Sequence, residues 1–593
     1  MEHRFKRWLS IKKEQNARGI LLLGIVLFNI ALWFFSSIIA YIIAPNQYDN
    51  MVSALWESGI TWMLEPGFYD PTVPYAIRIM SIIVIVTSMI TFTGGIIGYV
   101  GNLFSNFIDQ SKEGKNKLYL YDHIVILNWN HKGLELISDY QFDDQTTTVV
   151  ILSHHPKEKI EESISRKLYL DTSSKKKIDV IVREGEVFSK SDLMKMCIED
   201  AKSIIILSED NQDDKTLHKD MLAMKTLMLI ANLDIKRDQT IIVEVKDQKS
   251  VSLIQDYIGK HTNKRDKILP ILPDELMGRL IAQTLLMPEL NKVYHELLSF
   301  EGVEFYTHPD MDPKTYMETH QKAIPIYSHK DILYVLSDHQ RNIFEKRQTP
   351  LSTFTKLHIK DQSRYQEKHI VVFGRNRKLP YILDSIALYE KENNTKIHIT
   401  LIEANDAQAI KKTTDALTHV DHILILSSDY LAPEAYDSDV LMTLLMTQDL
   451  AKKHHAEIII ELLDPRHFDI AQSYNVRNTI ISNEYISRLM TQLSKNRMLY
   501  DLFIDLLTYD AEDSEEETYE VYTYQAKDII GSSLPISFSS RADAIYAFYM
   551  SGAQEYVLIG LIKDQQLDLF KGDLDERKTI TINPDDYVVL ICK

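Results

Sequence analysis

The sequence predicts an α-helical membrane domain with two spans, followed by two Rossmann-like α/β domains that each end in a small β-rich lobe. Two long, almost uncharged apolar runs lie near the N-terminus, at Gly19–Ala44 and Tyr75–Val100. Each has about 26 residues and, at about 1.5 Å per residue, is longer than the hydrocarbon core of a bilayer, which is about 30 Å thick. After Lys117, apolar strands alternate with amphipathic helices, and the pattern occurs twice. Such alternation is typical of doubly wound, mostly parallel sheets.

The overall composition excludes several classes of protein. The chain has 593 residues and a formal net charge of −18, which argues against a nucleic-acid-binding protein. Its two cysteines, Cys197 and Cys592, form no CxxC motif. Neither a disulfide framework nor a structural zinc site is therefore expected, and a reducing compartment fits the soluble part.

The distribution of basic residues predicts the orientation of the chain in the membrane. Residues 1–18 are rich in Lys and Arg, whereas residues 45–74 contain neither. The positive-inside rule therefore predicts a plasma membrane protein whose two termini and soluble domains are cytoplasmic. The first apolar run is too long for a cleaved signal peptide. The basic segment before it is either a short interfacial helix or an unstructured leader.

A short segment between the two apolar runs, residues 50–67, is half apolar and too short to cross a bilayer. A helix, a re-entrant loop and a second helix are the plan of a tetrameric cation channel subunit, because irregular backbone at membrane depth is tolerated only where it lines a cavity. The predicted filter is Leu64, Glu65, Pro66 and Gly67. Glu65 is expected to form an acidic ring that attracts cations, or else to be an exposed loop acid. No TVGYG-like sequence is present, so potassium, sodium and calcium are all candidate permeant ions.

Glycines gather in the cytoplasmic half of the second apolar run, at Gly94, Gly95 and Gly98. Glycine weakens a helix by about 1 kcal/mol relative to alanine and also lets helices approach closely. The sequence leaves two interpretations open, a gating hinge and ordinary helix packing.

The soluble part contains an internal duplication. Predicted strands of the first copy lie at 123–127, 147–152, 179–182, 203–207 and 240–245, and those of the second at 369–373, 397–402, 421–426 and 457–462. After them, the sequence LPDELMGRLIAQTL at 272–285 is matched by ISNEYISRLMTQLS at 481–494. Each copy ends in a β-rich appendage, near 300–340 and near 518–593.

Both copies carry a degraded dinucleotide-binding fingerprint. That fingerprint needs glycines for the tight turn and for close approach of the backbone to a pyrophosphate. The first copy has NWNHKG and the second has GRNRKLP at the corresponding turn. NAD is therefore not an expected ligand. Two interpretations of the turn in the second copy stay open: a turn without a ligand, or a site in which some other ligand is held by Gly374, Arg375, Arg377 and Glu403.

Carboxylates at the carboxyl edge of the first sheet suggest a divalent-cation site. Glu209, Asp210, Asp213 and Asp214 follow the fourth predicted strand, and Glu184 follows the third. Carboxylate oxygens are the ligands that Ca²⁺ prefers, so these five residues are a candidate calcium site. The alternative is a solvated helix N-terminus, where acidic residues are favoured by the helix dipole.

The layout resembles the Castor/Pollux ion channel family, which is known from plant symbiosis signalling and has bacterial relatives. The matching stretches are ALWESGITWMLEPG at 54–67, DHIVILNWN at 122–130, IIILSEDNQDD at 204–214, ILPDELMGRLIAQTLLMPEL at 271–290 and NPDDYVVLI at 583–591. The paired soluble domains look like RCK domains, regulators of potassium conductance. The resemblance implies a homotetramer in the lipid bilayer with a cytoplasmic ring of eight such domains, regulated by calcium. Bacterial relatives often have Asp-Pro-Gly in the filter, where this chain has Glu65.

These observations define a domain plan and three hypotheses about function. The expected segments are an interfacial segment 1–18, a pore domain 19–104 with spans at 19–44 and 75–101, a linker 105–121, a first RCK domain 122–350, a linker 351–367 and a second RCK domain 368–593. The leading hypothesis is a ligand-gated cation channel without enzymatic activity. The alternatives are a membrane-anchored sensor that regulates a separate transporter and a nucleotide-dependent oxidoreductase, against which the degraded fingerprints argue.

Overall fold

The computed structural model divides the chain into two compact units, residues 1–116 and 117–593, and each is considered by itself. The residues that the structure describes are 2–60, 62, 74–95, 97–101, 104–105, 116–142, 147–170, 178–209, 216–233, 238–260, 267–287, 289–300, 302–348, 350–351, 355–360, 366–393, 395–402, 417–428, 433–474, 476, 478–508, 519–531 and 534–592. The predicted filter residues 64–67 lie outside these ranges.

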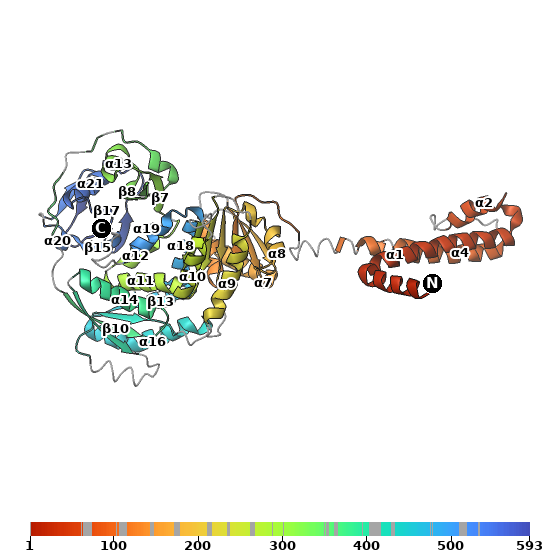
Figure 1. Cartoon of the computed structure of the whole chain (residues 1–593), viewed down its shortest axis with the longest axis horizontal. Coiled ribbons are helices and arrows are strands. Elements are labelled where there is room, and N and C mark those ends of the chain that lie inside the picture. Colours follow the sequence, from red (N-terminus) through yellow and green to blue (C-terminus); the bar gives the residue numbers. More distant parts are fainter. Residues whose placement is uncertain are drawn as a thin grey trace. The chain divides into compact units, whose positions relative to one another are not determined.

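The first unit consists of helices (Figure 1). Its elements are α1 (Glu2–Ile43), η1 (Pro45–Gln47), α2 (Met51–Ala54), the π-helical turn η2 (Leu55–Ile60), α4 (Tyr75–Ser88) and a second π-helical turn η3 (Met89–Thr93). Helix α2 and the turn η2 lie in the segment between the apolar runs. The helix begins at Asn50, whose side chain caps it by accepting a hydrogen bond from the Ser53 N–H at 2.9 Å. The basic N-terminal segment is also helical, as part of α1.

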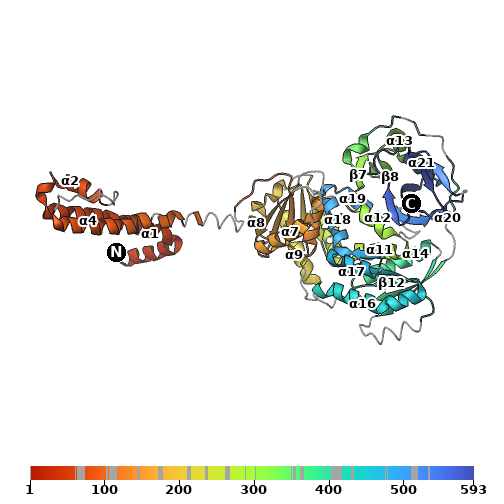
Figure 2. The same cartoon turned by 180° about the vertical axis from the view of Figure 1, so that it is seen from behind.

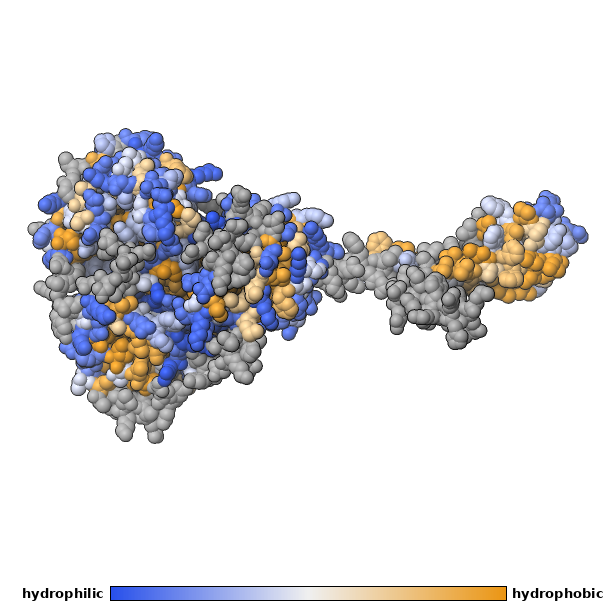
Figure 3. All heavy atoms as spheres, in the orientation of Figure 1, coloured by the Kyte–Doolittle hydropathy of each residue, from blue (hydrophilic) through white to orange (hydrophobic). Residues whose placement is uncertain are grey.

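Most of the large apolar side chains that the structure describes in this unit are exposed, as the orange surface in Figure 3 shows. Within α1, the 21 residues Leu23–Ile43 are long and apolar enough to cross a membrane, and only 22% of this span is buried. The core helix of a soluble protein would be buried instead. The second apolar helix, Tyr75–Thr91, is shorter than the predicted span 75–101 among the described residues, so the structure supports the first span more strongly than the second.

Three contacts hold the apolar helices together. The Trp33 indole N–H donates to the Leu55 carbonyl oxygen at 2.8 Å, which fastens η2 to α1. The Thr91 hydroxyl donates to the Asn29 side-chain oxygen at 3.1 Å, which links η3 to α1. Gly95 faces Ile25 so closely that a β-carbon there would lie 3.0 Å from its Cδ1. Gly95 therefore lies close against α1, whereas Gly98 has open space beside it.

The second unit contains two parallel sheets that share one strand plan (Figure 1). The first sheet has the order β3-β2-β1-β4-β5-β6, with β1 (Ile124–Leu127), β2 (Thr148–Ser153), β3 (Asp179–Glu184), β4 (Ser203–Ile206), β5 (Thr240–Glu244) and β6 (Ile268–Ile271). The second has the order β11-β10-β12-β13-β14, with β10 (Gln366–Phe373), β11 (Thr395–Ile402), β12 (His422–Ile425), β13 (Glu457–Leu462) and β14 (Asn478–Ile481). The predicted Rossmann-like fold is confirmed, with the order reversing between β1 and β4 and between β10 and β12.

The helices cover both faces of each sheet. Those of the first copy are α6 (Lys132–Tyr140), α7 (Lys157–Leu170), α8 (Lys190–Lys195), α9 (Thr216–Ala231), α10 (Gln248–Lys260), α11 (Pro273–Leu286) and α12 (Leu290–Leu297). Those of the second are α14 (Leu379–Glu392), α16 (Pro433–His454), α17 (Phe468–Ser473), α18 (Ser482–Lys495) and α19 (Leu499–Leu506). Alternate residues of β1 enter different cores, because successive strand side chains point to opposite faces.

Two helices are exchanged between the copies. Helix α11 follows the last strand of the first sheet and packs on α14 of the second copy, while α18 follows the last strand of the second sheet and packs on α6 of the first. Figures 1 and 2 both show α11 beside α14. One face of each sheet therefore contributes to a single core that spans both copies, and the opposite face of each sheet has a core of its own.

The predicted β-rich appendages are present and pack against each other. The first has the antiparallel order β7-β9-β8, with β7 (Glu304–Pro309), β8 (Ile324–His329), β9 (Ile332–Ser337) and helix α13 (Pro313–Thr319). The second contains β15 (Glu520–Gln525), α20 (Ala526–Ile529), β16 (Ile536–Phe538), α21 (Arg541–Ser551), β17 (Tyr556–Lys563), β18 (Gln566–Leu569), β19 (Ile580–Ile582) and β20 (Tyr587–Cys592). The buried Arg347 pairs with Asp575 between the two lobes.

The turn after β10 depends on glycine and gives a test of the fold. Gly374 has φ +84°, and a β-carbon there would lie 2.2 Å from the Leu426 carbonyl oxygen. We expect Gly374→Ala to destabilise the chain by more than about 2 kcal/mol, because the clash adds to the about 1–2 kcal/mol cost of a left-handed residue. Thermal unfolding of the full chain in detergent measures this loss.

Gly572→Ala is the matched control, since Gly572 has φ +74° and no atom within 4 Å of an added β-carbon. Gly572→Ala should lose only the stability that corresponds to the conformational cost of a left-handed alanine. Equal losses for the two variants would contradict the steric argument.

Candidate functional site at the carboxyl edges of the two sheets

The first turn of each copy begins with a residue in the left-handed conformation. Asn128 has φ 73° and Gly374 has φ 84°. Their backbone N–H groups bond to the ends of the neighbouring strands, Asn128 to Leu152 at 2.8 Å and Gly374 to Ile402 at 3.2 Å. Gly374 is a predicted ligand residue, and the close approach of the Leu426 carbonyl oxygen requires a glycine at this position.

Behind this turn, the first copy contains a buried cluster of three polar side chains. Asn130 donates from its amide to Glu244 Oε2 at 3.0 Å, and the Lys132 ammonium lies 3.0 Å from Glu244 Oε1. The Ser208 backbone N–H also donates to Glu244, at 3.0 Å. The side chain of Glu244 is 1% exposed. The cluster ties the start of α6 to the carboxyl ends of β4 and β5.

The second copy repeats this cluster at the equivalent positions. Asn376 donates to Glu461 Oε2 at 3.1 Å, and Lys378 lies 2.8 Å from Glu461 Oε1. The Ser482 hydroxyl donates to the same carboxylate. Lys378 also lies 3.7 Å from Asp274 of α11, so in this copy the cluster reaches the exchanged helix of the other. We call the two groups the carboxyl-edge clusters.

The ionisation of Glu244 follows from this arrangement. Burial disfavours the charged carboxylate, but Lys132, Lys246 and the Ser208 N–H outweigh it, so the pKa of Glu244 lies below its ordinary value. The polar groups at the topological switch point are thus largely paired with one another. Two buried hydroxyls at this edge, Ser208 and Ser427, have no hydrogen-bond partner among the described residues.

In each copy an aspartate holds the loop that follows the strand of the cluster glutamate, β5 in the first copy and β13 in the second. Asp220 accepts from the N–H groups of Lys246 at 2.9 Å and Asp247 at 3.1 Å. In the second copy Asp437 accepts from the corresponding N–H groups of Leu463 and Asp464, at 2.8 and 3.0 Å. These carboxylates hold the loop beside each cluster in one conformation.

The sequence analysis did not assign roles to these clusters. The signal was available, because the Asn-x-Lys pattern recurs at 130–132 and 376–378 and a Glu occupies the same place in VEVKD and IELLD. A glutamate within an otherwise apolar buried strand requires a partner, since an unpaired buried charge is costly.

The structure separates the two predicted calcium ligands that it describes. Glu184 is the last residue of β3 and is exposed, and Glu209 is half-buried after β4. Strands β2 and β1 lie between them, which corresponds to about 14 Å between the strand axes. Asp210, Asp213 and Asp214 lie outside the described residues, so the calcium site as predicted remains a proposal.

The predicted ligand residues of the second copy are also only partly described. Arg375 is exposed and Arg377 is half-buried, while Glu403 lies outside the described residues. Their positions next to Gly374 place the two arginines at the carboxyl edge of the second sheet. The predicted ligand site remains a proposal.

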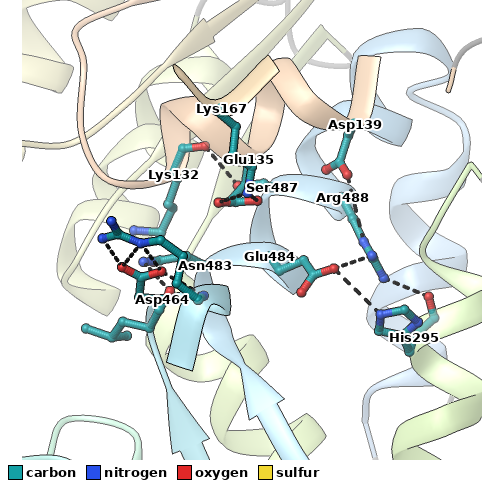
Figure 4. Close-up of polar contacts among 12 residues, drawn as sticks. Lys132, Glu135, Asp139, Lys167, His295, Asp464, Asn483, Glu484, Ser487 and Arg488 are labelled. Carbon is teal, nitrogen blue, oxygen red and sulfur yellow. Dashed lines mark hydrogen bonds and ion pairs between the residues drawn. The ribbon is translucent and has the colours of Figure 1, made fainter. Parts of the chain in front are cut away.

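Helix α18 brings charged side chains into the interface with α6 (Figure 4). Arg488 pairs with Glu484, donates to the His295 carbonyl oxygen at 2.8 Å and lies 3.8 Å from Asp139. The Ser487 hydroxyl donates to the Lys132 carbonyl oxygen at 3.1 Å. Its counterpart in α11 is Gly278, where a β-carbon would lie 2.9 Å from the Lys378 carbonyl oxygen. The two exchanged helices therefore meet the two carboxyl-edge clusters at equivalent backbone positions.

The fold is a tandem of two Rossmann-like copies that share a strand order, a polar cluster and exchanged helices. The family described as calcium-activated potassium channel slowpoke-like RCK domain matches residues 120–255. Among solved structures, the GsuK channel bound to NAD covers 98% of this chain at 13% identity, with a TM-score of 0.40.

The resemblance to the Castor/Pollux ion channels is confirmed over most of the chain. The ion channel DMI1 of Medicago truncatula is 22% identical over 86% of this chain and 66% of its own length. The ion channel CASTOR of Lotus japonicus is 22% identical over 86% of this chain and 68% of its own length. The calcium-gated potassium channel TvoK of Thermoplasma volcanium is 25% identical over 43% of this chain and 65% of its own length. The chain spans about two thirds of the length of these relatives. Their names agree with the prediction that the chain is not an enzyme.

The carboxyl-edge cluster of the first copy gives a stability test. We expect Lys132→Met to destabilise the chain by about 3–5 kcal/mol, because it leaves the Glu244 carboxylate buried without its cation. The double variant Lys132→Met with Glu244→Gln should recover part of this loss, since the charge is then removed as well. Denaturant unfolding of the full chain measures both.

The exposed pair Arg166–Glu162 supplies the control, with side chains 70% and 68% exposed. Arg166→Met should cost less than about 1 kcal/mol. A loss of the same size in Lys132→Met would show that Glu244 does not need its partner.

Asp139 gives a test by pH. Burial raises its pKa well above the ordinary value, and the nearby Arg488 offsets this only in part. As the pH rises above about 4, the carboxyl group ionises in the unfolded state but stays protonated in the folded state. The free energy of unfolding therefore falls until the pH reaches the folded-state pKa. We therefore expect the stability of Asp139→Asn relative to the parent to increase as the pH rises from 4 to 8.

Thermal unfolding at a series of pH values checks this difference, with Asn replacing the exposed Asp256 as control. A stability difference that is the same at both pH values would refute the assignment to Asp139 ionisation.

Proposed function

We propose that the chain is a subunit of a homotetrameric, ligand-gated cation channel of the Castor/Pollux type. The observation that carries the proposal is an exposed apolar helical unit joined in one chain to two RCK-type copies that exchange helices. Relatives over most of the chain are named ion channels, and one over part of it is named a calcium-gated potassium channel. More than one subunit is needed because one copy of the helical unit cannot enclose a water-filled path, and four is the number that we propose.

In this proposal Glu65 lines the pore as one member of an acidic ring, and potassium is the permeant ion, with sodium and calcium as alternatives. Calcium is the proposed regulatory ligand. The residues proposed to bind it are the acids that follow β4, namely Glu209, Asp210, Asp213 and Asp214, and the unpartnered Ser208 hydroxyl adds a polar group at the same sheet edge. The soluble domains and both termini are proposed to face the cytoplasm at the plasma membrane.

Gating requires a connection between the sheets and the second apolar helix. The end of the linker is held to the first copy, because the Leu118 N–H donates to the Lys195 carbonyl oxygen at 2.8 Å and the Cys197 thiol donates to the Leu118 carbonyl oxygen at 2.7 Å. On the membrane side, the π-helical turn Met89–Thr93 directly precedes Gly94 and Gly95. Such turns are frequent at functional sites in helices, which supports the proposed hinge at Gly94, Gly95 and Gly98.

A ligand shifts the channel only if it binds the open and closed shapes with different affinity. The carboxyl-edge clusters and the shared core connect the two copies. A structural change at one sheet edge would therefore alter the angle between the copies. We propose that this change is passed through residues 105–121 to the second apolar helix.

Recording from the purified full chain in planar bilayers tests the pore assignment. We expect Glu65→Gln to lower the single-channel cation conductance several-fold, because the variant removes one negative charge per subunit from the ring. Glu57→Gln is the matched control, since Glu57 is the other acid of the loop and is an exposed residue of η2. It should leave the conductance close to that of the parent.

Currents are recorded before and after calcium is added to the side that bears the soluble unit, and the particle mass is measured in detergent. A monomer or dimer, or a current that is the same in Glu65→Gln and the parent, would contradict the proposal. Absence of any current from a tetramer would favour the anchored sensor.

A further inference from the structure

The second copy carries a cluster of two histidines and one glutamate far from the carboxyl edge. Glu367 and His369 lie on β10, and His398 lies on β11. The ligand atoms of these three side chains all lie within 4.8 Å of one another. All three precede the middle of their strands and are therefore at the amino edge of the sheet, opposite to the clusters described above.

The strand register explains why these side chains meet. His369 and His398 are direct partners in the parallel ladder between β10 and β11, so both project from the same face of the sheet. Glu367 precedes His369 by two residues and lies on that face as well. Strand β11 is at the edge of the sheet, which leaves this face partly open, with side-chain exposures of 51% for Glu367, 37% for His369 and 45% for His398.

The side chains are already directed at one another. The His398 Nε2 atom lies 2.7 Å from Glu367 Oε1, and the His369 Nε2 atom lies 4.0 Å from the same oxygen. The two imidazole rings are stacked, with centroids 4.7 Å apart and an angle of 16° between their planes. Both Nε2 atoms thus face one carboxylate oxygen, which is the arrangement that a shared cation requires.

The backbone beneath the cluster is held from the other side. Asp421 accepts a hydrogen bond from the His369 N–H at 2.7 Å and returns one from its own N–H to the His369 carbonyl oxygen at 2.9 Å. Asp421 also bonds to His419 at 3.0 Å, and the ring of His419 stands edge-on to that of His369 with centroids 5.5 Å apart. His419 therefore lies beside His369, with its own ring nitrogen bonded to Asp421.

We propose that Glu367, His369 and His398 form a binding site for a transition-metal dication of the Zn²⁺ class. Two imidazole nitrogens and one carboxylate oxygen are a ligand set that Zn²⁺ accepts, with bonds of about 2.0–2.2 Å and a tetrahedral geometry. That geometry places neighbouring ligand atoms about 3.3–3.5 Å apart, so small side-chain rotations from the present positions suffice. Imidazole ligands favour Zn²⁺, Co²⁺ and Cu²⁺ over Ca²⁺, which prefers oxygen. The site is thus distinct from the proposed calcium site in ligand chemistry and in position.

The probe is Co²⁺ or Zn²⁺ added to the purified full chain in detergent, after removal of any affinity tag. We expect saturable binding by titration calorimetry with one tight site per chain. Cobalt should also give visible absorption typical of nitrogen and oxygen ligands. An excess of Ca²⁺ should not displace the metal.

Substitution of the ligands distinguishes this site from other surface histidines. His369→Ala and His398→Ala should each weaken binding at least tenfold, and Glu367→Gln should weaken it while keeping the shape of the side chain. His155→Ala is the matched control, because His154 and His155 are exposed, have rings 4.2 Å apart and stand elsewhere on the chain. It should leave the tight site unchanged.

Lys396→Ala controls for damage to the strand pair, since Lys396 is the exposed register partner of Glu367. Removal of this cation should leave binding as tight as in the parent or tighter. The proposal is overturned if the parent shows no saturable site, if the three ligand variants bind like the parent, or if Lys396→Ala loses binding to the same degree. Thermal unfolding of each variant verifies that it is folded.

Discussion

The reciprocal packing of α11 and α18 is the constraint on which the soluble unit depends. Each helix leaves the copy in which its sequence begins and covers the first helix of the other copy. Without this exchange the face of each sheet that joins the shared core would be open to water. Because the hydrophobic effect is proportional to the apolar area removed from water, the two copies stabilise one another and neither core is complete by itself.

The polar contacts give this packing its specificity. Arg488 and Glu484 pair beneath α6, and Ser487 bonds to the backbone of Lys132, whose ammonium pairs with Glu244. In the second copy Lys378 pairs with Glu461 and also approaches Asp274 of α11. The sheet edge of each copy is thereby connected to a helix from the other. In a regulator with these connections, a structural change at one sheet edge would affect how the two copies pack against each other.

The two edges of the second sheet carry different chemistry. At the carboxyl edge, Glu461 is buried, and its carboxylate is bound by Asn376, Lys378 and Ser482. At the amino edge, Glu367 and two histidines are partly exposed and face one another. Burial makes the first group structural, since its charges are already compensated, and exposure leaves the second group able to exchange its own contacts for those of a cation.

Local pattern in the sequence determined the apolar helices, most strands and the duplication. Periodicity is a property of neighbouring residues, so the strand at 124–127 and its counterpart at 370–373 could be identified without the fold. The short strands β6 and β14 were missed, because four residues, with Pro270 in one of them, carry little periodic signal. The tertiary structure decided which helix covers which copy, and it brought Glu244 to Lys132 and His369 to His398. Those pairs join residues that are far apart in the chain, and only the order and register of the strands bring them within bonding distance.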